Sequence, residues 1–173
     1  YISSRKAADC DATAKELSAQ GECISLPADV STLDGIHALV AAYSAREATL
    51  DILVNNAGAA WGETFDTFPE SGWDKVVDLN LKAPFFLTQA LHDALKINAS
   101  AGRPSKVIII RSVDGFFVNP VESYSYHASK AGVRHLTKNM PMPPIARPHA
   151  LSPIPPRAFP TPTNHTPPTP RAS

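Results

Sequence analysis

Two short runs of branched aliphatic residues, each ending in polar side chains, most constrain how this chain can fold. Residues 51–58 read Asp-Ile-Leu-Val-Asn-Asn-Ala-Gly, and residues 106–112 read Lys-Val-Ile-Ile-Ile-Arg-Ser. Runs of this length and composition are typical of buried parallel strands. Ligands of open α/β sheets bind beyond the carboxyl ends of such strands. The pattern therefore predicts a ligand site at the edge of the sheet where Ser112 lies.

The residues before these runs alternate between predicted strands and helices. Residues 1–4 resemble the end of a strand, residues 7–20 a helix that Gly21 ends, and residues 23–26 the next strand. A second helix is expected from about Thr32 to Ala48, with Asp29 or Ser31 as a possible N-cap. Completed by the strand that ends at Asn55, this β-α-β-α-β order predicts an α/β fold with a doubly wound parallel sheet of Rossmann type.

Composition places the chain among ordinary single-domain proteins. Its 173 residues suit one domain with a sizeable core, and sixteen basic residues balance sixteen acidic ones. No basic face for nucleic acid is therefore expected, and no aliphatic run approaches the length of a membrane span. Two cysteines without ligand spacing favour a reducing, cytoplasmic location and argue against a metal site.

The sequence Tyr126-His127-Ala128-Ser129-Lys130 is a candidate catalytic motif. Residues four apart are neighbours on a helix, so the Lys130 ammonium is expected near the Tyr126 phenol and favours its ionised form. A free phenol has a pKa of roughly 10 and transfers protons poorly at neutral pH. A charge about 5 Å away is worth roughly 3 kcal/mol at an effective dielectric of about 20. Such a charge would make Tyr126 usable as a general acid.

Asn80 is a second candidate, because it interrupts the apolar face of a predicted helix over residues 71–95. Pro84 lies four residues later and has no N–H to donate to the Asn80 carbonyl. The free carbonyl could bind a water molecule. Alternatively, Pro84 only bends a long helix around the sheet.

Together these pieces closely resemble the short-chain dehydrogenase/reductase family. The matching features are the Asn-Asn-Ala-Gly turn, Asn80 twenty-four residues after Asn56, Ser112 at a strand end, and Tyr-x-x-x-Lys followed by Ala-Gly. Ser112 precedes Tyr126 by fourteen residues, one more than the commonest family spacing, but Val113 at the usual offset has no hydroxyl. Within the family, residues 115–130 look most like 3-oxoacyl-carrier-protein-reductase-like and rhamnolipid-synthesis-like members.

The resemblance implies reversible hydride transfer between a nicotinamide cofactor and a carbonyl or secondary alcohol. In the reductive direction Ser112 would hydrogen-bond the carbonyl oxygen and Tyr126 would donate the proton. Lys130 would promote ionisation of the tyrosine and bind the nicotinamide ribose, and the Asn80 carbonyl would hold a water of the proton relay. His127, inside the motif, is expected to face the surface or a neighbouring subunit and receives no catalytic role.

The resemblance also assigns cofactor residues. Arg5 lies in the turn where dinucleotide folds distinguish the ribose 2′ position, and a basic residue there favours NADP(H) over NAD(H). The alternative is that Arg5 and Lys6 are a solvated basic pair at a helix start. Asp29 and Val30 would contact the adenine. The small residues after Asn56, which are Ala57 and Gly58, would let the backbone approach the cofactor.

The expected substrate is a small carbonyl or alcohol compound. Phe116 and Phe117 follow Ser112 in a loop that would flank it, which favours an apolar substrate. Family members are commonly dimers or tetramers, so the intact protein is expected to be a homo-oligomer.

Family members begin with a strand and a Gly-x-x-x-Gly-x-Gly loop that binds the cofactor pyrophosphate, and no glycines here have that spacing. We expect that strand and loop to be missing, and the 173-residue chain to bind NADP(H) negligibly. The alternative is that the chain is not an enzyme. It would then be a catalytically inactive remnant, or an interaction segment that binds a partner through its C-terminal tail.

That tail begins at residue 139, after a partial NAD(P)-binding domain over residues 1–138. Twelve of the seventeen prolines fall in the last thirty-five residues, a density incompatible with a helix or central strand. One interpretation is a disordered proline-rich segment that carries a polyproline recognition motif at residues 153–156. The interpretation that we favour is a damaged strand of the family. Family members carry a sequence like Val-Asn-Ala-Ile-Ala-Pro-Gly at this place, and single G-to-C codon changes account for most of its differences from residues 151–157.

Overall fold

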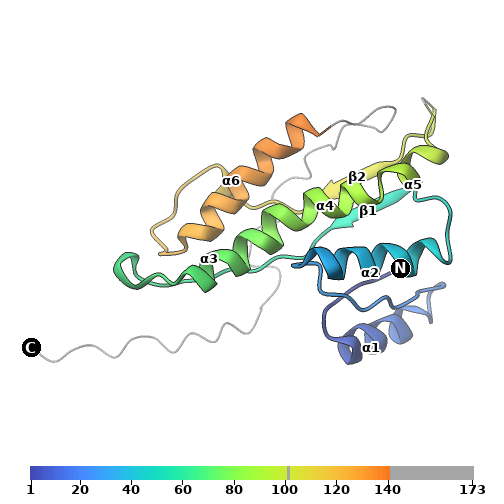
Figure 1. The fold of residues 1–173 in the computed structure, drawn as a ribbon, viewed down its shortest axis with the longest axis horizontal. Coiled ribbons are helices and arrows are strands. Elements are labelled where there is room, and N and C mark those ends of the chain that lie inside the picture. The colour runs from blue at the N-terminus through green and yellow to red at the C-terminus, as the bar shows by residue number, and fades with distance from the viewer. Residues whose placement is uncertain (101, 141–173) are drawn as a thin grey trace, which may run out of the picture.

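The computed structural model describes residues 1–100 and 102–140. Its α-helices and strands follow the order α1 (Ala7–Leu17), α2 (Leu33–Ser44), β1 (Ile52–Asn55), α3 (Glu70–Val77), α4 (Ala83–Ala90), α5 (His92–Ile97), β2 (Lys106–Ile109) and α6 (Tyr124–Asn139) (Figure 1). Two 3-10 turns, η1 (Phe65–Thr67) and η3 (Val113–Gly115), and a π-helical turn, η2 (Asp78–Lys82), lie between them. This alternation of helices and strands agrees with the α/β class expected from the sequence.

The sheet is parallel, as predicted, but has two strands in the described residues. β1 pairs with β2 in the register Ile52 with Lys106 through Asn55 with Ile109. The two strands expected nearer the N-terminus are reduced to one parallel bridge between Ile2 and Ser25. Because β1 and β2 run in the same direction, the residues after Asn55 and after Ile109 meet at one edge of the sheet.

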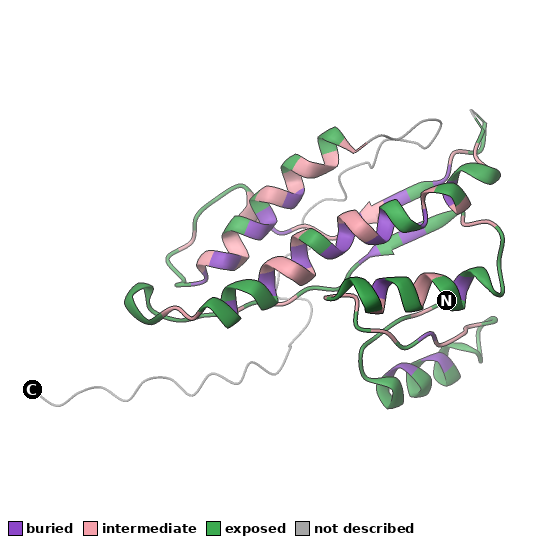
Figure 2. Ribbon diagram, in the orientation of Figure 1, coloured by how far each residue is buried: buried purple, intermediate pink, exposed green. Residues whose placement is uncertain are grey.

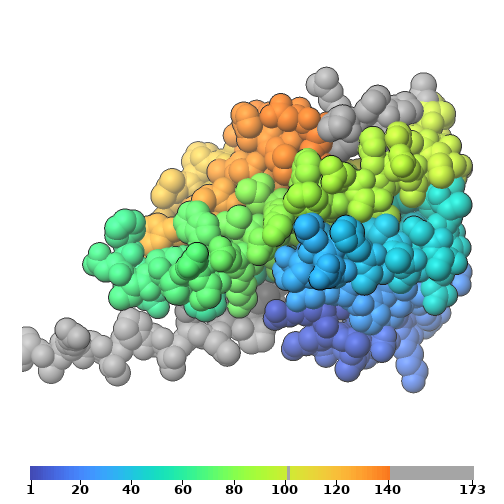
Figure 3. Space-filling model, in the orientation of Figure 1, coloured from blue at the N-terminus to red at the C-terminus, as the bar shows by residue number. Residues whose placement is uncertain are grey.

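One face of this sheet is covered by helices and supplies the core. Leu53 of β1 and Val107 and Ile109 of β2 are buried in a cluster with residues of the helical layer, which also contains Ile36, Tyr43, Ala83, Leu87, Leu91, Leu95 and Val133. In the space-filling view, the surface of α4 lies between the surfaces of α2 and α6 (Figure 3). On the other face, Ile52 is 52% exposed and Val54 is 51% exposed. Figure 2 shows this alternation of buried and exposed residues along the strands.

The start of α2 differs from the sequence prediction. Thr32 is the N-cap, because its side-chain oxygen accepts a hydrogen bond from the Gly35 amide at 3.0 Å. Asp29 and Ser31 do not cap the helix; the Asp29 carboxylate instead accepts from the amide and hydroxyl of Ser31. A methyl group on Gly35 would lie 1.9 Å from the Asp29 carbonyl oxygen, so glycine allows α2 to pack against this turn.

The predicted helix over residues 71–95 is a series of shorter elements. Its central part, η2, is π-helical: the Ala83 amide donates to the Asp78 carbonyl, five residues earlier. The sequence argument that Pro84 leaves the Asn80 carbonyl free assumed the four-residue spacing of an α-helix, whereas this turn has five-residue spacing. The free carbonyl therefore stays a prediction. The π-helical turn instead coincides with the position of Asn80, whose side chain forms the contacts described below.

The proposed boundary at residue 138 lies at the end of α6, which continues to Asn139. Both interpretations of the proline-rich tail concern residues 139–173, of which residues 141–173 lie outside the described part of the chain. In the described part of the chain, no helix has the length and apolar character needed to cross a membrane.

Candidate active site

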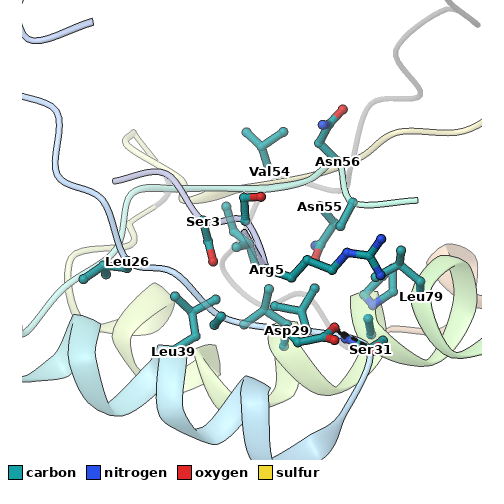
Figure 4. Close-up of a pocket in the computed structure, with 18 of the residues that line it drawn as sticks. Ser3, Arg5, Leu26, Asp29, Ser31, Leu39, Val54, Asn55, Asn56 and Leu79 are labelled. Atoms are coloured by element: carbon teal, nitrogen blue, oxygen red, sulfur yellow. Dashed lines mark hydrogen bonds between the residues drawn. The ribbon is translucent and has the colours of Figure 1, made fainter. Parts of the chain in front are cut away.

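A cavity of about 910 Å³ lies between the Ile2 bridge and β1. Its lining includes six of the residues predicted to bind the cofactor, namely Arg5, Asp29, Val30, Asn56, Ala57 and Gly58 (Figure 4). The apolar part of the lining includes Leu39, Leu53 and Leu87. The structure thus gathers residues from three separate segments around one space. Their role in binding a cofactor stays a prediction. Tyr126, Lys130, Asn80 and Ser112 are not part of this lining.

The polar side of the cavity combines a carboxylate and a guanidinium. Hydrogen bonds from the Ser31 hydroxyl at 2.7 Å and the Ser31 amide at 3.0 Å lower the pKa of Asp29, with a smaller contribution from the charge of Arg5. Figure 4 shows the Arg5 side chain extended along the cavity toward this turn. Lys6 pairs with Asp9 at 3.6 Å on the surface, whereas Arg5 has no carboxylate oxygen within 4.0 Å in the described residues. Of the two basic residues, Arg5 is therefore the one available to a ligand in the cavity.

The Asn80 side chain joins the turn after β1 to η2 and α6. Its Nδ2 donates to the Ala59 carbonyl at 2.9 Å and to Ser129 Oγ at 3.0 Å, and its Oδ1 accepts from the Ala59 amide at 2.8 Å. Asn80 is only 2% exposed, so these bonds satisfy a buried amide. The side chain, which the sequence argument did not use, holds the turn after β1 against the helix of the Tyr-x-x-x-Lys motif.

Gly58 lies where this turn meets the motif. A methyl group at Gly58 would lie 3.2 Å from Asn80 Oδ1 and 3.9 Å from Lys130 Nζ. Since Gly58 also lines the cavity, it connects the predicted cofactor residues to the predicted proton-transfer residues.

Tyr126 and Lys130 lie on the same side of α6, as their spacing predicts. Lys130 Nζ is 5.6 Å from the centre of the Tyr126 ring and donates to the Ile110 carbonyl at 3.1 Å. Lys130 is only 7% exposed, and this burial lowers the pKa of its ammonium group. The carbonyl of Ile110, just beyond β2, therefore fixes the lysine between the sheet edge and the tyrosine ring.

Ser112 lies three residues after the end of β2 and is buried. Its hydroxyl donates to Asp114 Oδ2 at 3.0 Å and accepts from the Asp114 amide at 3.2 Å. A methyl group on Gly115 would lie 2.6 Å from the Lys130 carbonyl oxygen, so η3 packs directly on α6. This contact brings the serine loop and the lysine turn together.

Of the two positions predicted for His127, exposure at the surface is wrong, whereas contact with a neighbouring subunit stays a prediction. Its side chain is 14% exposed, with Nδ1 2.9 Å from the Ser123 carbonyl oxygen and Nε2 4.0 Å from Asp114 Oδ1. Sequence reasoning also gave no role to Asp114, which contacts both Ser112 and His127. In the sequence, the only feature that pointed to Asp114 was its position two residues after Ser112.

The sequence of this chain is similar to those of known proteins. Residues 1–148 match the family described as short chain dehydrogenase. The chain belongs to the short-chain dehydrogenase/reductase family. The resemblance inferred from the turn, the serine and the Tyr-x-x-x-Lys motif is therefore confirmed.

Two curated relatives illustrate the similarity. A rhamnolipids biosynthesis 3-oxoacyl-[acyl-carrier-protein] reductase of Pseudomonas aeruginosa is 42% identical over 138 residues, covering 80% of this chain and 54% of the relative. A 2-dehydro-3-deoxy-D-gluconate 5-dehydrogenase of Escherichia coli is 41% identical over 117 residues, covering 68% of this chain and 45% of the relative. The chain thus spans about half the length of the curated relatives it matches, and the predicted likeness to acyl-carrier-protein and rhamnolipid reductases is confirmed.

Solved structures give the same result. The NADP active-site complex of RhlG from Pseudomonas aeruginosa has a TM-score of 0.76 and 42% identity, covering 79% of this chain and 54% of that chain. A gluconate 5-dehydrogenase from Burkholderia cenocepacia, in complex with NADP and tartrate, has a TM-score of 0.68 and 30% identity, covering 80% and 53%. Both are NADP complexes, which agrees with the cofactor predicted from Arg5.

Proposed function

We propose that this chain belongs to an oxidoreductase that transfers a hydride between NADP(H) and a carbonyl or secondary alcohol. The observation that carries the proposal is the position of the Lys130 ammonium. It is buried, 5.6 Å from the Tyr126 ring centre, and next to the Gly58 turn that lines the cavity. A cation in this place can stabilise negative charge that develops on a neighbouring phenol oxygen during proton transfer, and it can bind ribose hydroxyls.

The proposed roles follow from this geometry. In reduction, Tyr126 donates the proton to the carbonyl oxygen, Ser112 hydrogen-bonds that oxygen, and Lys130 stabilises the tyrosinate that remains. Asn80 holds the cofactor-facing turn through its side chain. The proposal that its carbonyl also binds a relay water rests on the family resemblance alone.

The cofactor is proposed to bind with its adenosine end in the cavity. Asp29 and Val30 would contact the adenine, Arg5 the 2′-phosphate, and Asn56 to Gly58 the central part. Similar proteins that are NADP complexes support the choice of NADP(H) over NAD(H). Chemically, the bound nicotinamide supplies or accepts the hydride.

An apolar substrate is supported by the loop after Ser112. Phe117 is 72% exposed and Val118 is 91% exposed, an arrangement that suits contact with an aliphatic chain. The substrates in the names of similar proteins include a 3-oxoacyl group. We propose a 3-oxoacyl thioester as the first substrate to test, and a homo-oligomer as the state of the whole protein.

The cofactor proposal can be tested on the product of the gene's full reading frame with two small probes. Adenosine 2′,5′-bisphosphate should bind more tightly than 5′-AMP, because only the former presents a 2′-phosphate to Arg5. Arg5→Ala should remove this preference, and Lys6→Ala should retain it because Lys6 pairs with Asp9. The difference should be about tenfold, as one charge-assisted hydrogen bond implies. Equal affinities for the two probes in isothermal titration would contradict the assignment of Arg5.

The catalytic proposal can be tested on the product of the gene's full reading frame. Tyr126→Phe should lower kcat for NADPH-dependent reduction of a 3-oxoacyl thioester by about 100-fold or more, since general acids contribute this much. Tyr124→Phe is the matched control, because the Tyr124 hydroxyl contacts only Glu122, at 3.4 Å, in the described residues. Equal effects of the two substitutions would refute the role of Tyr126.

A further inference from the structure

The Ser112 hydroxyl is hydrogen-bonded to the carboxylate of Asp114, which has no role in the proposed reaction. This hydroxyl has one proton, and in the structure the proton is directed at Asp114 Oδ2, 3.0 Å away. The other carboxylate oxygen, Oδ1, accepts from Asn119 Nδ2. Ionised carboxylates are among the strongest hydrogen-bond acceptors in proteins. A substrate carbonyl that needs the Ser112 proton must therefore compete with Asp114.

His127 lies on the other side of Asp114, with its ring orientation fixed. Nδ1 is 2.9 Å from the Ser123 carbonyl oxygen, which can accept a hydrogen bond from it, and 3.1 Å from the Ser123 hydroxyl, which can accept from a protonated Nδ1 or donate to a bare one. Nε2 is buried without a hydrogen-bond partner and lies 4.0 Å from Asp114 Oδ1. A bare Nε2 would direct its lone pair toward a carboxylate. An imidazolium, which carries protons on both nitrogens, would instead form an ion pair with it.

We propose that Asp114 competes with the carbonyl substrate for the Ser112 proton, and that a second proton on His127 weakens Asp114 in this competition. The inference rests on the proposed role of Ser112. Asp114 and His127 act through Ser112 and are positioning residues. When the imidazolium neutralises the carboxylate, the serine hydroxyl is released to turn toward the substrate oxygen.

Other charged groups near α6 are engaged elsewhere. The elements packed against α6 are η3, α3 and η2, and Asp114 is the only carboxylate in the described residues with an oxygen within 4.0 Å of a His127 nitrogen. The cations on α6 and on these elements have the following contacts: Lys75 over the Trp61 ring, Lys82 with Asp78, Lys130 with the Ile110 carbonyl, and Arg134 over the Phe116 ring. His135 and Lys138 are exposed near the C-terminal end of α6. The remaining carboxylates on α3 are Glu70 and Asp74, and the ring of Tyr126 lies 6.4 Å from that of His127.

The proton arrangement can be tested without cofactor or turnover. In nitrogen-15 NMR of the 173-residue chain, recorded as the pH is lowered, the His127 ring signals are identified by their loss in His127→Gln. In Asp114→Asn the ring should gain its second proton only at a lower pH than in the unsubstituted chain. Asp93→Asn, which removes an exposed carboxylate paired with Lys96, should change nothing at His127. Gain of the second proton at the same pH in Asp114→Asn and in the unsubstituted chain would overturn the proposal.

The effect on Ser112 requires a double-mutant cycle in the product of the full reading frame. At pH 6, His127→Phe should lower kcat/KM for a 3-oxoacyl thioester about tenfold when Asp114 is present, as for a change of one hydrogen bond to a charged group. In the Asp114→Asn background the same substitution should have no effect. Equal losses in both backgrounds would overturn the proposal, because a purely structural His127 acts independently of Asp114. If the unsubstituted protein lacks activity, the proposed function fails, while the NMR experiment still decides the proton arrangement.

Discussion

At the scale of one residue, the buried ammonium group of Lys130 lowers the stability of the fold. Its ammonium group is buried, and its pKa is lowered by that burial, since the charged form loses hydration. The Ile110 carbonyl supplies one hydrogen bond but no opposite charge. A buried cation without a carboxylate partner destabilises the fold and is retained only where chemistry requires it.

Lys130→Met should therefore raise the free energy of unfolding at neutral pH by about 1 kcal/mol, while abolishing reduction. The folded pKa lies below the unfolded value, so the unfolded state binds more protons between the two values and the stability of the unsubstituted chain rises with pH there. The increase in the free energy of unfolding caused by Lys130→Met should accordingly become smaller as the pH rises toward 10. Urea unfolding at pH 7 and pH 10 checks both expectations. Lys138→Met, on the exposed end of the same helix, is the control and should change neither value.

The positions of individual side chains could be predicted from the sequence where regular secondary structure determines them. The four-residue spacing of Tyr126 and Lys130 on one helix was enough to place them on one side of α6. His127 was misplaced because the pattern of α6 does not reveal η3, which packs on the helix and buries the ring. Asp114 was missed for the same reason: its contacts with Ser112 and His127 depend on tertiary structure and not on local spacing.

At the scale of elements, Gly115 controls how closely η3 approaches α6. An added methyl would lie 2.6 Å from the Lys130 carbonyl oxygen, and this backbone atom cannot turn away as a side chain can. Gly115→Ala should lower the free energy of unfolding by about 1–3 kcal/mol, as overpacking does. Gly21→Ala is the control, since nothing lies within 4 Å of its added methyl. Similar midpoints for the two variants in urea unfolding would contradict the close packing of η3 on α6.

The elements themselves were largely expected, whereas their irregular parts were not. Apolar periodicity identified the helical regions and the two strands, but it averages over turns and cannot detect a single π-helical turn. η2 places Asn80 where its side chain reaches both Ala59 and Ser129, which is a tertiary requirement. The N-cap of α2 was likewise decided among three neighbouring polar residues by the close approach of Gly35 to Asp29.

At the scale of the whole molecule, the two faces of the sheet have different environments. In residues 1–100 and 102–140, helices bury Leu53 and leave Ile52 and Val54 about half exposed. A strand buried on both faces gives a continuous aliphatic run, so the sequence could not distinguish the covered face from the open one. The structure makes that distinction, residue by residue along β1.

Substitution by threonine can measure this asymmetry, because threonine retains a high strand propensity. The double variant Ile52→Thr and Val54→Thr should change the free energy of unfolding of the 173-residue chain by less than about 0.5 kcal/mol per site, and should reduce binding of an apolar dye. Leu53→Thr, in the same strand, should cost about 2–3 kcal/mol, because it removes buried methyl groups and buries a hydroxyl. Equal costs on the two faces would mean that the open face is covered in solution, for example by self-association, which sedimentation at two concentrations would reveal.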